Sequence, residues 1–189
     1  MQFPQKPHLD AVQRTLCYVR ATLDHALFYA VDIPLELHGY TDADWAGSTS
    51  DERFTSGFMF TLGSAAITWS NKKQSTIALS STEAEYRGAA VAACEVACLC
   101  KLLMDLRLQV DREVVIYYDN LSSIQLARNS VFHVRTKHIV VHYHFVRDQI
   151  LASSIDLVYV NIKEQIANIF TKALGAEKLR RFWTMLGSL

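Results

Sequence analysis

The chain has 189 residues, half of them hydrophobic, and its 19 Lys and Arg balance 19 Asp and Glu, so the formal net charge is zero. This length fits one main globular domain with a small appendage, and the charge balance excludes a broadly basic surface, so any nucleic-acid-binding surface must be local. Four cysteines, no secretory signal and no apolar run of membrane-spanning length predict an intracellular protein, cytoplasmic or nuclear, that is not secreted and has no membrane partner.

The first predicted element is an amphipathic helix over 7–24. Its apolar residues recur at steps of three and four, as a helix with one apolar face requires: Leu9, Val12, Leu16, Val19 and Leu23. Strand-like stretches follow, separated by turn clusters rich in Asp, Gly, Ser and Pro. We expect these stretches to form an antiparallel meander, with strands over 26–31, 35–45, 57–62 and 66–70.

A long Ala-rich helix over 81–106 comes next, and helices then alternate with strands. The expected elements are a strand over 114–118, helices over 122–128 and 137–151, a strand over 156–160, and helices over 163–173 and 177–186. This order predicts an α/β fold in which a parallel extension joins the antiparallel meander. Side chains at the strand ends, beside the switch in strand order, then meet in a natural crevice.

Carboxylates occur where three of these elements begin or end. Asp42 and Asp44 lie at the end of one strand, Glu85 opens the long helix, and Asp119 ends another strand. Asp42 and Asp44 share one strand face, so the alternation of side chains does not choose between them. A carboxylate set favours Mg²⁺, which prefers oxygen ligands, and paired Mg²⁺ ions can hydrolyse a phosphodiester without a protein nucleophile.

The two glutamates that open the long helix are predicted to face different ways. Steps of three or four from Glu85 meet a continuous apolar stripe, so Glu85 heads the buried face. The same steps from Glu83 meet Arg87 and Lys101, which predicts an outer face on which Glu83, with Ser80, caps the helix.

Other interpretations of these residues remain open. Glu85 could be a solvated acid at the edge of the stripe, and Asp119 could cap the helix that follows it. A structural zinc site would need the histidines near the long helix and three cysteines, but one helix face cannot hold all three histidines. Those residues are His138, His142 and His144, with Cys94, Cys98 and Cys100.

Lysines beside Trp69 form the predicted phosphate-contact patch. Lys72 and Lys73, with Gln74, follow the third strand of the meander and could contact a nucleic-acid backbone. An ordinary exposed hairpin end is the alternative.

Ordered motifs run along nearly the whole chain, over 39–47, 55–57, 70–74, 79–86, 118–120, 135–139, 143–147 and 169–172. Together they resemble the ribonuclease H domain of copia-type LTR retrotransposon Pol polyproteins. The first helix resembles the C-terminal end of the reverse transcriptase that precedes that domain, and the tail resembles the end of the polyprotein. The resemblance implies three parts: 1–34 from the reverse transcriptase, 35–175 as the ribonuclease H domain, and 176–189 as the C-terminal helix.

The resemblance also implies a fold, a reaction and a site. The fold would be ribonuclease H-like, a five-stranded mixed sheet in the order 3-2-1-4-5 flanked by helices. The reaction would be hydrolysis of the RNA strand of an RNA:DNA hybrid, with two Mg²⁺ or Mn²⁺ ions, giving 3′-hydroxyl and 5′-phosphate ends. The implied catalytic metal ligands are Asp42, Glu85, Asp119 and the residue at 168. The predicted partners are the hybrid and the reverse transcriptase domain of the same polyprotein, with nucleic-acid contacts from Lys72, Lys73, Gln74, Ser81, Asn120, Lys137 and His138.

The chain departs from the family pattern at Asn168, where the family usually has a fourth acid. An asparagine oxygen can still bind Mg²⁺, but one negative charge is lost, so we expect reduced rather than abolished cleavage. Val140 and His142 also differ from the family's common residues. The alternative function is a domesticated or decayed domain that binds nucleic acid or a protein partner without significant catalysis. A different nuclease or integrase of the same fold fits the motifs over 79–86 and 169–172 less well.

Overall fold

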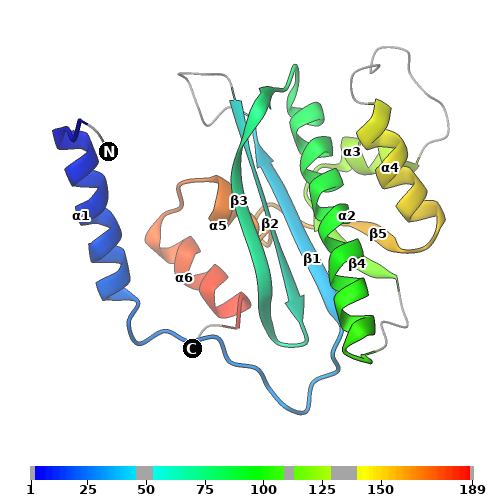
Figure 1. Cartoon of the computed structure of the whole chain (residues 1–189), viewed down its shortest axis with the longest axis horizontal. Helices are drawn as coiled ribbons and strands as arrows, with labels where there is room; N and C mark the ends of the chain where they lie inside the picture. Colours follow the sequence, from blue (N-terminus) through cyan, green and yellow to red (C-terminus); the bar gives the residue numbers. More distant parts are fainter. Residues whose placement is uncertain (1–2, 46–52, 109–112, 129–139, 188–189) are drawn as a thin grey trace.

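The computed structural model describes residues 3–45, 53–108, 113–128 and 140–187 (Figure 1). In chain order, the elements are α1 (Lys6–Ala21), β1 (Leu37–Asp44), β2 (Arg53–Leu62), β3 (Ala65–Ile77), α2 (Ser81–Asp105), β4 (Val114–Tyr118), α3 (Leu121–Arg128), α4 (Val140–Leu151), β5 (Ile155–Tyr159), α5 (Asn168–Thr171) and α6 (Ala176–Met185). None of the helices in these ranges combines the length and the apolar composition that a membrane span requires.

The five strands form one mixed sheet in the order β3-β2-β1-β4-β5. β1 pairs antiparallel with β2, and β2 pairs antiparallel with β3, whereas β4 lies parallel to both β1 and β5. The predicted α/β fold and its strand order are therefore confirmed. Because β1 and β4 are parallel neighbours, their carboxyl ends lie side by side at the centre of the sheet.

Helices cover both faces of the sheet (Figure 1). On one face, the apolar stripe of α2 packs into the main core with side chains such as Phe58 and Ile116. On the other face, Met59 packs with Ile166 and with Phe182 of α6. The neighbours Phe58 and Met59 point to opposite faces because side chains alternate along a strand. The sheet is thus the middle layer, with α2 and α4 on one side and α5 and α6 on the other.

The helix α1 contributes nothing to this core. None of its residues is buried, and the five apolar residues of its predicted stripe are 45–72% exposed. In Figure 1 it stands beside α6, away from the sheet. The periodicity predicted the helix correctly, but not where its apolar face would pack.

Two predicted elements are wrong. The expected strand over 26–31 contains no strand, because its backbone groups bond singly to other partners: Phe28 N–H donates to the Gly187 carbonyl and Ala30 N–H to the Ser64 hydroxyl. The expected helix over 163–173 is reduced to the four residues of α5, preceded by turns. The predicted strand over 66–70 is correct in type but too short, since β3 continues to Ile77.

Candidate metal centre

Asp42 lies at the centre of the site, on the face of β1 that α5 covers. Its side chain is fully buried, and both carboxylate oxygens accept hydrogen bonds from residues at the end of α5. The Thr171 hydroxyl donates to Oδ2, and the Lys172 ammonium donates to Oδ1 at 2.9 Å. A carboxylate this deep requires polar or charged partners, because an isolated buried charge is very costly.

Glu85 reaches the same place from the first turns of α2. The helix begins at a Ser80 cap, whose hydroxyl accepts a hydrogen bond from Glu83 N–H at 3.1 Å. Behind the cap, Ala84 packs in a small buried cluster with Ala43 of β1 and Phe54 of β2, which fixes the start of α2 against the sheet. Glu85 is 8% exposed and heads the buried stripe, as predicted.

Glu83 was expected on an outer face, and this expectation is wrong. Its side chain is 1% exposed. One carboxylate oxygen accepts a hydrogen bond from Leu79 N–H at 2.9 Å, and the other lies 2.7 Å from a guanidinium nitrogen of Arg87. Burial is tolerated because the charge has an ionic partner and a backbone donor. Glu83 therefore caps the helix and belongs to its packing, outside the carboxylate cluster.

Asp119 follows β4 and completes the cluster. One carboxylate oxygen from each of Asp42, Glu85 and Asp119 lies within 4.8 Å of the other two. Asn120, and not Asp119, caps the helix α3: the Asn120 side-chain oxygen accepts a hydrogen bond from Ser123 N–H at 3.0 Å. Asp44 is absent from the cluster, so the geometry selects Asp42 from the pair.

The cluster fits a divalent cation. Glu85 Oε2 and Asp119 Oδ1 are buried and have no hydrogen-bond donor among the described residues. Burial, followed by repulsion from Asp42 and Asp119, raises the pKa of Glu85 from 4.5 to about 9. Burial and Asp42 also raise the pKa of Asp119. Unsatisfied oxygens that repel one another are what a hard cation would stabilise, and oxygen-only ligands suit Mg²⁺ or Mn²⁺.

Asn168, the first residue of α5, lies beside the cluster and is fully buried. Its side-chain oxygen accepts a hydrogen bond from Lys172 Nζ at 2.7 Å, and its amide nitrogen donates to the Ile162 carbonyl at 3.2 Å. Lys172 therefore joins Asn168 to Asp42. The asparagine oxygen faces the site, although it contacts an ammonium group in this structure.

No zinc cluster is present in the described part of the chain, where the three carboxylates are the only group able to share a metal ion. Cys94, Cys98 and His144 are exposed. His138 and the side chain of His142 lie outside the described residues, as does the side chain of Val140.

Comparisons with known proteins identify relatives along nearly the whole chain. Over 187 residues, 99% of its length, the chain is 41% identical to the retrovirus-related Pol polyprotein from transposon RE2 of Arabidopsis thaliana. It is 36% identical over the same number of residues to the polyprotein from transposon TNT 1-94 of Nicotiana tabacum. The chain is a homologue of copia-type Pol polyproteins. It spans only 13% and 14% of the length of these two relatives, and no family model matches it.

Solved structures identify the fold of this Pol homologue. It superposes on LC11-RNase H1, solved in complex with an RNA/DNA hybrid, with a TM-score of 0.54 and 15% identity, covering 72% of this chain and 94% of that one. An N-terminal RNase H domain from Mycobacterium tuberculosis gives a TM-score of 0.51 at 15% identity, with coverages of 79% and 97%. The predicted ribonuclease H-like fold is confirmed.

The predicted nucleic-acid contacts of the Pol homologue fall in several places. Lys72 and Lys73 are exposed and lie within β3, opposite Ser56 and Thr55, rather than after the strand as expected. The Gln74 amide is turned to the Ser56 hydroxyl at 2.6 Å. Of the other four, Ser81 is exposed at the start of α2 and Asn120 caps α3, whereas Lys137 and His138 lie outside the described residues.

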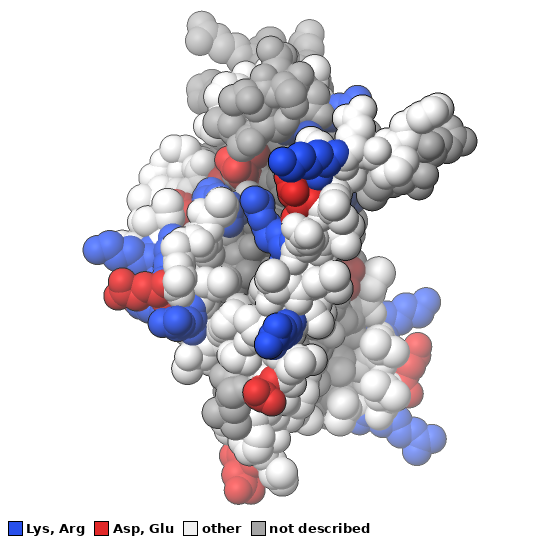
Figure 2. All heavy atoms as spheres, turned by 90° about the vertical axis from the view of Figure 1, so that its left-hand side faces the viewer, with Lys and Arg blue, Asp and Glu red and all other residues white. Residues whose placement is uncertain are grey.

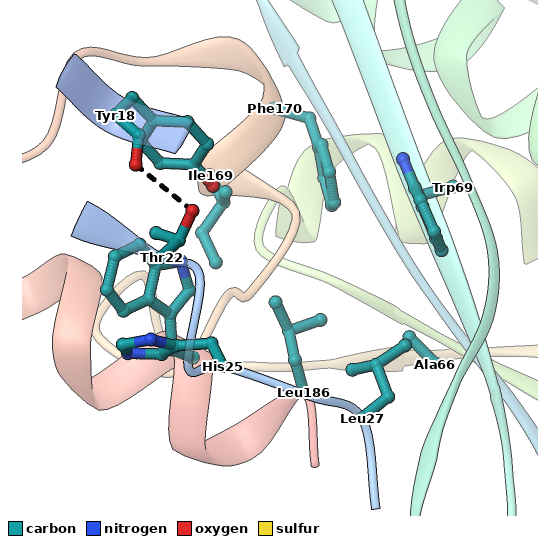
Figure 3. Close-up of a pocket in the computed structure, with 10 residues that line it drawn as sticks. Tyr18, Thr22, His25, Leu27, Ala66, Trp69, Ile169, Phe170 and Leu186 are labelled. Carbon is teal, nitrogen blue, oxygen red and sulfur yellow. Dashed lines mark hydrogen bonds between the residues drawn. The ribbon is translucent and has the colours of Figure 1, made fainter. Parts of the chain in front are cut away.

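Two cavities are lined by residues other than the three clustered carboxylates. One, of about 340 Å³, is lined mainly by apolar side chains from the end of α1, from β3, α5 and α6. They include Trp69 and Phe170 (Figure 3), together with Trp183 of α6. The other, of about 380 Å³, lies between α3 and β5. Figure 2 shows the face on the α1 side, where charged side chains of both signs are scattered among many uncharged ones.

Sequence reasoning missed three residues that build the site of the Pol homologue. Gln165 is fully buried, and its amide donates to the carbonyl oxygens of Thr41 at 3.0 Å and Tyr117 at 3.5 Å, which joins β1 to β4. Thr171 and Lys172 hold Asp42. The motif over 169–172 contained two of these residues, but no local pattern reveals a contact with a residue about 130 positions away.

Proposed function

We propose that this chain is a retrotransposon ribonuclease H, a metal-dependent endonuclease that hydrolyses the RNA strand of RNA:DNA hybrids and leaves 3′-hydroxyl and 5′-phosphate ends. The observation that carries the proposal is the convergence of Asp42, Glu85 and Asp119 from three separate elements, with buried oxygens that lack donors. The similarity to a ribonuclease H solved with an RNA/DNA hybrid supports the choice of substrate.

The metal ligands would be Asp42, Glu85 and Asp119, with Asn168 contributing an uncharged oxygen to the second of two Mg²⁺ or Mn²⁺ ions. When bound, these ions supply Lewis-acid stabilisation of the charge that develops on the scissile phosphate. The chain itself fixes the ligands in place. The buried Gln165 bridge holds the strands that carry two of the aspartates at a fixed spacing.

The asparagine at position 168 is consistent with slower cleavage of the hybrid rather than with loss of cleavage. Its oxygen lies at the site and can bind a cation or a coordinating water, but a neutral ligand attracts Mg²⁺ less than a carboxylate does. The metal requirement should therefore be higher than with an acid at this position. Changing Asn168→Asp should raise the rate or lower the Mg²⁺ requirement, and no change in either would remove this residue from the ligand set.

A domain that binds without significant catalysis is the second candidate, and Asn168 favours it as well. In that case the fold and the hybrid-binding surface would persist while hydrolysis is lost. The predicted nucleic-acid contacts are shared by both candidates, so binding alone does not distinguish them. Hydrolysis of the RNA strand does distinguish them, because only the first candidate predicts it.

The reverse transcriptase domain of the same polyprotein is the proposed protein partner. The relatives are far longer than this chain, and the apolar stripe of α1 is 45–62% exposed, as expected of a surface that packs on another domain. Under this proposal, residues 1–34 belong with the reverse transcriptase, 35–175 form the ribonuclease H domain, and 176–189 form its C-terminal helix. The site of action would be intracellular.

The deciding experiment is incubation of the purified chain with a labelled RNA:DNA hybrid and Mg²⁺, beside an Asp119→Asn variant. Cleavage of the RNA strand by the unaltered chain alone, abolished by EDTA, is the expected result. Equal binding of the hybrid by both proteins without cleavage by either would favour the second candidate. A duplex of DNA alone serves as the substrate control and should stay intact.

A further inference from the structure

Lys172 lies where two of the proposed metal ligands meet. Its ammonium nitrogen is 2.9 Å from Asp42 Oδ1 and 2.7 Å from Asn168 Oδ1. Burial alone would lower the pKa of Lys172, but the negative charges of Asp42, Asp119 and Glu85 raise it. The side chain therefore carries its positive charge inside the ligand set.

We propose that Lys172 is a built-in competitor of the divalent metal, an ammonium group that neutralises Asp42 in the metal-free protein and must leave it before a metal ion binds there. This inference rests on the proposed function, because it concerns the same site. It adds a specific step, which is the exchange of one cation for another at Asp42.

The chemistry of the two Asp42 contacts explains why only Lys172 must leave. Thr171 donates a neutral hydroxyl to Oδ2, and a carboxylate oxygen has a second lone pair left for a metal ion. The ammonium of Lys172, in contrast, would lie within a few ångströms of a divalent cation that shares its ligand. Like charges at that distance repel strongly in a partly buried site.

The surroundings of Lys172 allow it to leave. It follows the last residue of the four-residue α5, in an extended backbone conformation. Its side chain is 32% exposed, whereas that of Asp42 is fully buried. The ammonium can therefore turn toward water while Asp42 stays in place.

Asn168 has a second consequence under this inference. An aspartate at this position would add a charged metal ligand, but it would also hold Lys172 more tightly through a second carboxylate. The two effects oppose each other. Restoring the acid should therefore improve metal affinity less in the native background than in a chain that lacks the Lys172 charge.

The test is a Mn²⁺ titration of the protein without nucleic acid. The electron paramagnetic resonance signal of free Mn²⁺ gives the dissociation constant. Lys172→Gln keeps an N–H donor for Asp42 but removes the charge, and it should bind Mn²⁺ about tenfold more tightly or better. Lys172→Arg keeps the charge and should bind no more tightly than the native chain. Lys163→Met, at an exposed lysine of the same segment, is the matched control and should leave the affinity unchanged.

The same measurement on Asn168→Asp completes a double-mutant cycle. The gain in affinity from Asn168→Asp should be several-fold larger with Gln at 172 than with Lys. Equal gains in both backgrounds would contradict the opposition between the two effects and overturn the inference.

A measurement on the native chain covers the case in which Lys172→Gln does not fold. Acetylation of lysines, read by mass spectrometry, should become faster at Lys172 when Mn²⁺ is bound and stay constant at Lys163. Unchanged reactivity of Lys172 at saturating Mn²⁺ overturns the inference. So does a folded Lys172→Gln variant that binds Mn²⁺ no better than the native chain, and in both cases the metal site itself stands. Failure of every variant to bind Mn²⁺ overturns the metal site and the inference together.

Discussion

The side-chain amide of Gln165 donates a hydrogen bond to the backbone carbonyl oxygen of Thr41, 3.0 Å away and 124 positions earlier in the chain. Gln165 is fully buried, and the same amide lies 3.5 Å from the carbonyl oxygen of Tyr117 on the neighbouring strand. The segment before α5 is therefore tied to β1, which carries Asp42, and to β4, which directly precedes Asp119.

Replacing this bridge should destabilise the protein. We expect Gln165→Leu to lower the free energy of unfolding by about 1 to 3 kcal/mol, because buried carbonyl oxygens lose their donor. Urea denaturation gives the value. Gln125→Leu, at an exposed position on α3, is the control and should change stability by less than about 0.5 kcal/mol. Similar losses in both variants would argue against a bridging role.

Gly57 should be needed for α5 to approach Asp42. It lies opposite Asp42 in the β1–β2 ladder, and a methyl group there would come within 2.8 Å of Phe170 Cβ and 2.9 Å of Thr171 Cγ2. Gly57→Ala should cost about 1 to 3 kcal/mol of stability through overpacking and should weaken Mn²⁺ binding. Calorimetric unfolding and Mn²⁺ titration test the two effects.

The control for that change is Gly88→Ala. A methyl group at Gly88 would have its nearest contacts at 3.6 to 3.8 Å, and the residue lies inside α2. Alanine is favoured over glycine in a helix by roughly 1 kcal/mol, so this variant should be as stable as the native chain or more so. A loss of stability at Gly88 as large as at Gly57 would refute the steric argument.

The metal-free protein should become less stable as the pH rises. The pKa of Glu85 is about 9 in the folded chain and 4.5 in the reference state, so between these values the folded chain holds a proton that the unfolded chain has released. Stability from this group is fully present below pH 4.5 and is lost as the pH rises toward 9, by up to about 1.4 kcal/mol per pH unit. Thermal unfolding in EDTA across this range measures the slope.

Glu85→Gln is the matched variant for the pH series. It cannot release a proton, so its stability should fall less steeply with pH than that of the native chain. Added Mg²⁺ should stabilise the native chain more at high pH, because the metal competes with the proton for the same carboxylate. Parallel pH profiles for the two proteins in EDTA would contradict the proposed pKa of Glu85.

The two aspartates at the end of β1 should differ sharply in importance. Asp42→Asn removes a proposed metal ligand and should lower the rate of hybrid cleavage by more than about 100-fold. Asp44→Asn changes the same residue type two positions later, outside the cluster, and should keep the rate within about threefold of native. The cleavage rates of the two variants are compared at saturating Mg²⁺. An equal loss of rate in both would contradict a special role for Asp42.

Regular periodicity made much of this structure predictable. Alternation and helical steps located β1, α2 and β4, and the apolar stripe of α2 placed Glu85 on the buried face. These signals work because each element buries one face, which leaves a repeat in the sequence. Glu83 escaped the same logic, since its ion pair with Arg87 makes burial possible for a residue that the pattern assigns to the surface.

Irregular segments were predicted poorly for a physical reason. In the segment over 26–31, Phe28 N–H bonds to the distant Gly187 carbonyl. In the segment over 163–173 the backbone forms local turns, but the side chain of Gln165 bonds to the distant carbonyl of Thr41. A local pattern carries no record of such partners. The contact between Lys172 and Asp42 belongs to the same class, so the cation inside the site could be found only from the structure.

The placement of α5 has a consequence for copies of this sequence that carry a premature stop codon. A chain that ended just before residue 168 would still contain all five strands and all three clustered carboxylates. It would lack α5 and α6, whose Ile169, Phe170 and Phe182 pack with Met59 on one face of the sheet, and this apolar layer would be open to water. Truncation there would disable the protein while every acidic residue of the cluster stayed intact.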